Sequence, residues 1–187
     1  EICKLSEKFG SLVIIDEAYY HFNNITAQSL IKNCKNLIVV RTFSKAFGMA
    51  GMRIGYTMSN SKIIGYMLSI KPIYEINAFN MKLVRLLIKN IHVMKNYVKE
   101  VHKGRSLLKK FLDTKKIEMI GKYSNTVLFK LDSKNKVDKV IKYLFKHKFI
   151  IRPMKIDSDD KYIRATLGSS MIMNKFIKKL KVALTEN

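Results

Sequence analysis

The sequence of 187 residues has little cysteine and no long apolar run. Its two cysteines, Cys3 and Cys34, have no metal-like spacing and no partner cluster, which argues against a disulfide framework and against a zinc site. We therefore expect no metal and a reducing, cytoplasmic setting. The longest apolar runs, such as residues 12–15, are far shorter than the roughly 20 residues that a membrane helix requires, so no membrane span is expected.

Acidic residues are also scarce. The 14 Asp and Glu stand against 36 Lys and Arg, which gives a formal net charge of 36 − 14 = +22. Such a balance favours an anionic partner, but 30 of the 36 basic residues are Lys and they are spread over the whole length. Pairs such as Lys109-Lys110 and Lys178-Lys179 are scattered, and no aromatic-rich recognition motif accompanies them. A basic nucleic-acid-binding module is thus the remote alternative, and neither nucleic acid nor membrane is the expected partner.

In the first 77 residues, expected strands and helices alternate as they do in an α/β sheet. Residues 12–15 and 36–42 are short runs rich in β-branched residues, which is typical of strands buried on both faces of a parallel sheet. Residues 53–59 form a third such run, and we expect it to be antiparallel because the preceding loop is too short for a helical crossover. The expected helices of this part cover residues 1–9, 29–35 and 60–68.

Beyond residue 77 the pattern changes twice. A helical period sustained over residues 78–111 predicts one long helix that connects two parts of the chain. The expected strands then cover residues 117–120, 126–131, 149–152 and 161–167, with helices over 137–147 and 171–184 and an N-cap at Ser169 or Ser170. Residues 112–187 are therefore expected to form a small α+β unit.

Polar side chains lie where the first two strands end. Asp16 ends the first strand and the segment RTFSK, residues 41–45, ends the second. Ligands of open α/β sheets bind beyond the carboxyl ends of the strands, so both groups point to one crevice. An Asp there can hold a cationic ring nitrogen, and the Lys can form a Schiff base with an aldehyde. Thr42, Ser44 and Arg53 suit a phosphate, and the combination describes pyridoxal phosphate.

Two stretches, IIDEAYYHF at 14–22 and RTFSKAFGMAGMRIGYTMSN at 41–60, resemble the aspartate and lysine motifs of fold-type I pyridoxal-phosphate-dependent aminotransferases, specifically the histidinol-phosphate aminotransferase group. The later stretches YSNTVLFKL, IIRPM and YIRATLGS resemble the carboxy-terminal domain of that group in the same order. The resemblance covers this whole chain but only the second half of the family's chain. We therefore expect a fragment that is not fully active alone.

The resemblance implies an α/β fold of the fold-type I PLP-transferases, with a partial large-domain sheet and a small α+β carboxy-terminal domain. Residues 1–77 would be the carboxy-terminal part of the cofactor-binding large domain, 78–111 the long connecting helix, and 112–187 the small domain. Family members are homodimers whose sites borrow residues across the interface, so a partner subunit is implied.

The resemblance also implies roles for single residues around the cofactor. Lys45 would hold pyridoxal 5'-phosphate as an aldimine and move the proton between the substrate Cα and the cofactor. Asp16 would keep the pyridine nitrogen protonated, which makes the ring an electron sink. Tyr19 would donate to the 3′ oxygen of the ring. Ser44 and Arg53 would bind the phosphate, with Thr42 as a weaker candidate.

For the substrate, Arg164 in YIRATLGS matches the small-domain arginine that binds the anionic end, and Arg152 in IIRPM matches a second arginine near it. Asn125 and Tyr74 are further candidates for pocket lining. The implied reaction is amino transfer between histidinol phosphate and 2-oxoglutarate or glutamate, a step of histidine biosynthesis. Two alternatives use nearly the same motifs: a threonine-phosphate decarboxylase-like activity and transamination of another substrate by a class I/II aminotransferase.

Each assignment has a plainer alternative. Lys45 could be a solvated surface lysine, Asp16 a helix N-cap, and Arg53 the partner of a surface carboxylate. Arg152 and Arg164 lie in strand patterns, where exposed arginines are common. The motif context favours the functional reading for Lys45 and Asp16 most strongly.

Overall fold

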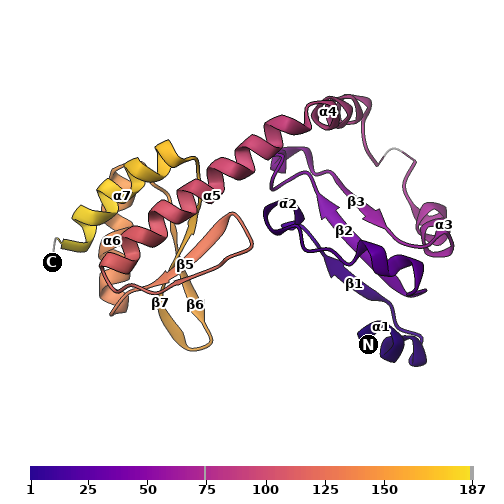
Figure 1. Cartoon of the computed structure of the whole chain (residues 1–187), viewed down its shortest axis with the longest axis horizontal. Coiled ribbons are helices and arrows are strands. Elements are labelled where there is room, and N and C mark those ends of the chain that lie inside the picture. Colours follow the sequence, from indigo (N-terminus) through magenta and orange to yellow (C-terminus); the bar gives the residue numbers. More distant parts are fainter. Residues whose placement is uncertain (74, 186–187) are drawn as a thin grey trace. The chain divides into compact units, whose positions relative to one another are not determined.

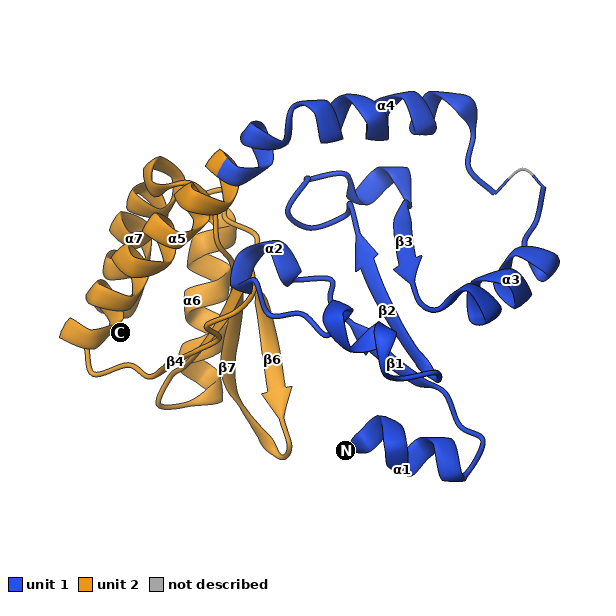
Figure 2. Ribbon diagram, turned by 45° about the vertical axis from the view of Figure 1, so that its right-hand side comes forward, with its two compact units in different colours: residues 1–95 blue, residues 96–187 orange. Residues whose placement is uncertain are grey.

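The computed structural model describes residues 1–73 and 75–185 and contains two compact units, residues 1–95 and residues 96–187 (Figure 2). Tyr74, a candidate for pocket lining, lies outside the described residues. Across the described ranges, no helix has the length and apolarity that crossing a bilayer requires. Both units combine helices with strands, as predicted, and we describe each by itself.

Unit 1 is built on a three-stranded sheet in the order β1-β2-β3 (Figure 1). The strands are β1 (Val13–Asp16), β2 (Leu37–Thr42) and β3 (Gly55–Met58). β1 runs parallel to β2, whereas β3 runs antiparallel to it, which confirms the orientation expected from the short preceding loop. Leu37 and Val39 of the central strand are fully buried, as expected for apolar residues between two neighbouring strands.

The helices of unit 1 are α1 (Ile2–Lys8), α2 (Tyr20–Asn23), η1 (Gln28–Lys32), η2 (Ala50–Met52), α3 (Ser61–Ile70) and α4 (Ala78–Lys89). The helix expected over residues 29–35 is thus only a short 3₁₀ helix, η1. Asn60 and Asn77 begin α3 and α4, because each side chain accepts a hydrogen bond from the backbone N–H three residues later. None of α1, α3 and α4 contains a buried residue.

The sequence predicts one helix over residues 78–111, but the structure has two helices there, α4 and α5 (Ile91–Thr114). The prediction of a single helix is therefore wrong. Asn90 lies between them with φ −109° and ψ 40°, outside helical geometry. Its side-chain Nδ2 and its backbone N–H both donate to the carbonyl of Leu86. A side-chain amide that competes for a backbone carbonyl is a known reason for a helix to end. Because only one residue is non-helical, the apolar spacing continues on both sides of it.

Unit 2 contains a four-stranded antiparallel sheet in the order β4-β5-β7-β6 with helices packed on one face (Figure 1). Its elements beyond α5 are β4 (Met119–Ile120), β5 (Thr126–Lys130), α6 (Lys134–Lys146), β6 (Arg152–Ile156), β7 (Asp159–Thr166) and α7 (Ser170–Thr185). The small α+β unit expected from the sequence is therefore present. The strand expected at 149–152 instead begins at Arg152 and forms a hairpin with β7.

Candidate active site

Asp16 and the lysine segment leave the unit 1 sheet at the same edge. Asp16 is the last residue of β1 and lies opposite Val40 of β2, which ends two residues later at Thr42. The Asp16 side chain is exposed, and its Oδ1 accepts a 2.8 Å hydrogen bond from the N–H of Ala18. Within the described part of the chain, no hydrogen bond engages Oδ2. One carboxylate oxygen is therefore held by the turn and the other can accept from an external donor.

Lys45 follows β2 and lies beside Tyr19. Its side chain is half-buried, and its Nζ is 5.5 Å from the centre of the Tyr19 ring. No carboxylate among the described residues forms an ion pair with this amine. Tyr19 immediately precedes α2, three residues after Asp16. The fold thus brings Lys45 and Tyr19 together and places both next to the strand end that bears Asp16.

The predicted phosphate-binding residues belong to the loop between β2 and β3. Thr42 Oγ1 accepts from the N–H of Ser44 at 3.0 Å and donates to the carbonyl of Ile54 at 3.3 Å. The Thr42 hydroxyl is therefore used to shape the loop, which favours a structural role. Arg53 is exposed, and its Nη1 donates to the carbonyl of Ala50 at 3.0 Å. Its φ of 53° lies in the left-handed region, where it ends the short helix η2.

Gly55 fixes how closely this loop returns to β2. A Cβ atom at Gly55 would lie 2.7 Å from the backbone oxygen of Arg41, a distance that real Cβ atoms do not show. Only glycine allows the start of β3 to pair with Thr42 at this distance. The loop that holds Ser44 and Arg53 is therefore anchored at both ends.

Sequence reasoning missed a buried ion pair at the same strand ends. Glu17 and Arg41 are 7% and 8% exposed, and the carboxylate Oε2 lies 2.9 Å from both Nε and Nη2 of the guanidinium. The signal was available, because Arg41 interrupts the apolar run of β2 and a charge in such a strand requires a buried partner. Burial alone lowers the pKa of Arg41, but hydrogen bonds with Tyr56 and Glu17 outweigh it and raise that pKa above its ordinary value.

Arg152 and Arg164 belong to unit 2, where they lie directly opposite each other on β6 and β7. Both are exposed, whereas the neighbours of Arg164 on its strand, Ile163 and Ala165, are buried. Like charges at opposed positions destabilise a sheet, and no carboxylate in the described ranges pairs with either arginine. This pair is therefore suited to an anion. The backbone oxygen of Asn125, just before β5, accepts a hydrogen bond from the N–H of Leu167, just after β7.

Solved structures of pyridoxal-phosphate-dependent enzymes share this α/β arrangement of strands and lysine loop. The histidinol-phosphate aminotransferase from Sinorhizobium meliloti in complex with pyridoxal-5'-phosphate is similar with a TM-score of 0.81 and 20% identity, over 92% of this chain and 48% of that chain. The L-threonine-O-3-phosphate decarboxylase from Porphyromonas gingivalis is similar with a TM-score of 0.80 and 21% identity, over 99% and 59%. These two likenesses show the fold alone.

The family follows from the sequence match. Residues 1–180 match the family model of aminotransferase class I and II, and the chain belongs to this family. The histidinol-phosphate aminotransferase of Thermoanaerobacter pseudethanolicus is 33% identical over 185 residues, which are 98% of this chain and 52% of the relative. The chain spans about half the length of the curated relatives it matches.

Proposed function

We propose that this chain supplies the lysine-bearing part of a pyridoxal-phosphate-dependent aminotransferase that transfers an amino group between histidinol phosphate and 2-oxoglutarate or glutamate. The main support is Lys45, a half-buried amine 5.5 Å from the Tyr19 ring centre and next to the strand end that bears Asp16. The relative from Thermoanaerobacter supports the choice of substrate.

The residues present suit pyridoxal phosphate by their chemistry. Lys45 offers an amine for the aldehyde, Asp16 offers an unengaged carboxylate oxygen for the ring nitrogen, and Tyr19 offers a phenol for the ring oxygen. Ser44 and the exposed Arg53 offer a hydroxyl and a guanidinium for the phosphate. When bound, the cofactor supplies an electron sink for the carbanion formed at the substrate Cα.

In this proposal each side chain has a defined task. Lys45 Nζ would bond to the aldehyde carbon of the cofactor, and the free amine would take up and return the proton at the substrate Cα. The Asp16 carboxylate would accept a hydrogen bond from the ring N–H and keep that proton in place. The Tyr19 hydroxyl would donate a hydrogen bond to the ring oxygen. Arg53 would neutralise the phosphate, and Thr42 holds the N–H of Ser44, so that the Ser44 hydroxyl would keep one position.

The substrate and assembly assignments belong to the same proposal. Arg164, with Arg152 opposite it, would bind the anionic end of the substrate, since an anion relieves the repulsion between two facing guanidinium groups. We further propose that residues 1–77 belong to the cofactor-binding domain and 112–187 to a small domain, joined through residues 78–111. The working protein is proposed to be a cytoplasmic homodimer, as the resemblance to the family implies.

The decisive experiment is a spectrum of the complete protein with pyridoxal phosphate. A visible absorption band should form, and borohydride reduction followed by peptide mass spectrometry should find the cofactor on Lys45. Lys45→Ala should abolish both signals, whereas Lys62→Ala, on exposed helix α3, should keep them. A band that persists in Lys45→Ala contradicts the proposal.

A second assay tests the reaction. Histidinol phosphate with 2-oxoglutarate should yield glutamate, and threonine phosphate should release little CO2. The opposite result would replace aminotransfer by the decarboxylase activity named for the Porphyromonas neighbour.

A further inference from the structure

The buried pair of Glu17 and Arg41 differs from the other ion pairs of the described residues. Its side chains are 5% and 7% exposed, whereas each of the other pairs has side chains at least 28% exposed. Removing two charges from water is costly, and apolar residues in their place often give equal or better stability. Stability alone is therefore a weak reason for this pair, and its contacts suggest a more specific one.

The Glu17 carboxylate holds the turn that follows α2. Its Oε1 accepts from the N–H of Ala27 at 2.6 Å and its Oε2 accepts from the hydroxyl of Thr26 at 2.9 Å. The N–H of Glu17 donates to the carbonyl of Val40 at 2.8 Å, which extends the β1–β2 ladder by one residue. Glu17 thus holds the end of β1, directly after Asp16, through both its backbone and its side chain.

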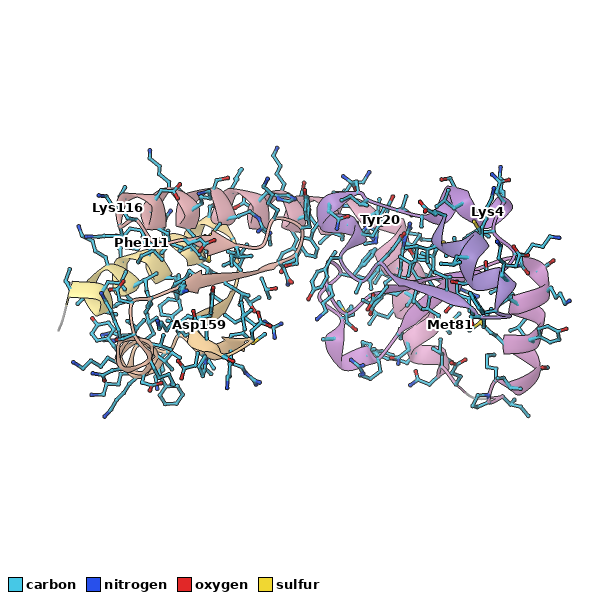
Figure 3. The ribbon with its side chains drawn as sticks, turned by 90° about the horizontal axis from the view of Figure 1, so that it is seen from below. Lys4, Tyr20, Met81, Phe111, Lys116 and Asp159 are labelled. Atoms are coloured by element: carbon cyan, nitrogen blue, oxygen red, sulfur yellow. The ribbon has the colours of Figure 1, made fainter. Side chains whose placement is uncertain are left out.

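The Arg41 guanidinium reaches the same segments from β2. Its Nη2 donates to Thr26 Oγ1 at 2.9 Å and to Gln28 Oε1 at 3.3 Å. Its central carbon lies 3.6 Å from the centre of the Tyr20 ring, which is labelled in Figure 3. This planar cation therefore ties β2 both to the turn before η1 and to the first residue of α2.

Two residues of this contact network are direct chain neighbours of residues in the proposed site. Glu17 follows Asp16, and Tyr20 follows Tyr19. Arg41 precedes Lys45 by four residues, at the start of the loop that bears the amine. Since successive strand residues point to opposite faces, the buried pair lies on the face away from the exposed Asp16 and does not compete for the ligand.

We infer that the Glu17–Arg41 ion pair is a positioning device, which sets the mutual placement of Asp16, Tyr19 and Lys45 through the strand ends and through Tyr20. The inference rests on the proposed function. Neither residue of the pair contacts the reacting atoms. Loss of the pair is expected to shift the proposed catalytic groups by small distances, and misplacements of about 1 Å can lower rates by about 100-fold.

The test compares Glu17→Gln and Arg41→Lys with wild type in the complete protein. Glu17→Gln keeps the shape of the side chain and loses its charge. Arg41→Lys keeps the charge but loses the paired N–H donors of the guanidinium and its stacking on Tyr20. In the proposed site the hydrogen bond from Tyr19 to the ring oxygen lowers the pH midpoint of the visible cofactor band. Displacing Tyr19 weakens that bond, so we expect the midpoint to move upward by about half a unit or more. We also expect kcat to fall about 10- to 100-fold while KM changes less than about threefold.

A purely structural role predicts a different outcome, and Leu144→Ala provides the control. This variant opens a cavity in the fully buried core of unit 2, so it should lower the thermal midpoint while the band's pH midpoint and kcat per bound cofactor stay at wild-type values. If Glu17→Gln behaves like this control, the inference is overturned. Should Glu17→Gln not fold, Glu17→Asp decides: a smaller upward shift supports the inference, and an unchanged midpoint with unchanged kcat overturns it.

Failure of the proposed function would look different. Wild type would then show neither a visible band nor reduction onto Lys45, whatever the variants do. If wild type shows both signals and the Glu17 and Arg41 variants match it in pH midpoint and kcat, only the positioning inference fails.

Discussion

Unit 2 buries its helices, whereas unit 1 leaves most of its helical surface exposed. Leu108 and Leu112 of α5, Leu144 of α6 and Leu180 of α7 are completely inaccessible to solvent. In unit 1, α1, α3 and α4 contain no buried residue, and Ile70 is 84% exposed. Unit 1 instead contains the lysine loop and the pair of charges that is buried at its strand ends.

The two units hold their side chains in place by different kinds of contact. Unit 2 relies on apolar contact between helices and one sheet face, which contributes stability roughly in proportion to the area removed from water. Unit 1 has a small sheet and fixes its strand ends by directed polar contacts to Glu17 and Arg41. Directed contacts define positions more narrowly than apolar contacts do, and the role proposed for Lys45 requires such defined positions.

The largest expected effect on stability comes from breaking the buried pair. Arg41→Met leaves the Glu17 carboxylate buried without its cation, which should lower the free energy of unfolding by about 3–5 kcal/mol. Lys130→Met breaks the Lys130–Asp159 pair of unit 2, whose side chains are 38% and 28% exposed, and should lower the free energy of unfolding far less, because water screens this pair. Urea unfolding followed by circular dichroism measures both; equal losses would contradict the contrast.

A second matched pair tests the apolar packing. Leu144→Ala in α6 removes a completely buried side chain and should cost about 2–5 kcal/mol. Ile70→Ala in α3 changes a side chain that is 84% exposed and should alter the free energy of unfolding by less than about 0.5 kcal/mol. The same denaturation measurement applies. A large loss in Ile70→Ala would mean that further polypeptide covers α3 in the protein studied.

The same substitution in two helical glycines should have opposite signs. A Cβ at Gly104 in α5 would lie 2.5 Å from the carbonyl oxygen of Gly168 and 2.8 Å from Met173 Cγ, so Gly104→Ala should destabilise by about 1–3 kcal/mol. A Cβ at Gly65 in α3 meets no atom within 4 Å, and Gly65→Ala should stabilise by about 0.5–1 kcal/mol. Thermal midpoints moving in the same direction would refute this difference in packing.

The smallest effect is a pH dependence in unit 2. A hydrogen bond from Lys103, followed by bonds from the hydroxyl and the N–H of Ser170, lowers the pKa of Glu100 to about 2. Because the folded-state pKa lies below the ordinary value of 4.5, the stabilisation is present above about pH 4.5 and is lost as the pH falls toward 2. Glu100→Gln should weaken the dependence of the thermal midpoint on pH between pH 5 and pH 2. A pH dependence equal to that of wild type would exclude the Glu100 carboxylate as a source of it.

Local patterns predicted much of the fold. Runs of β-branched residues marked β1 and β2, and the short loop before β3 gave its antiparallel direction, which the structure confirms. The errors have local causes as well. A single residue, Asn90, splits the expected long helix, and the hairpin with β7 moves the strand expected at 149–152 to Arg152–Ile156. Periodicity detects neither, because one residue hardly changes an apolar spacing and pairing depends on a distant strand.

The site divides in the same way. The positions of Asp16 and Lys45 at one sheet edge follow from where two apolar runs end, and their roles stay predictions of the resemblance. Arg41 stands out as a charge within an apolar strand, but nothing in the local pattern identifies Glu17, 24 residues away, as its partner. The sequence makes Thr42 a candidate for phosphate binding, yet its hydroxyl is engaged by Ser44 and Ile54.

The sequence by itself determined the α/β class, the family motifs and the absence of a cysteine-rich framework, because these depend on composition, period and short spacing. Only the tertiary structure decided that Glu17 and Arg41 share one buried contact and that Arg152 faces Arg164 across two strands. The physical reason is that desolvation and strand register arise only when segments far apart in the chain meet, and no window of sequence contains both partners.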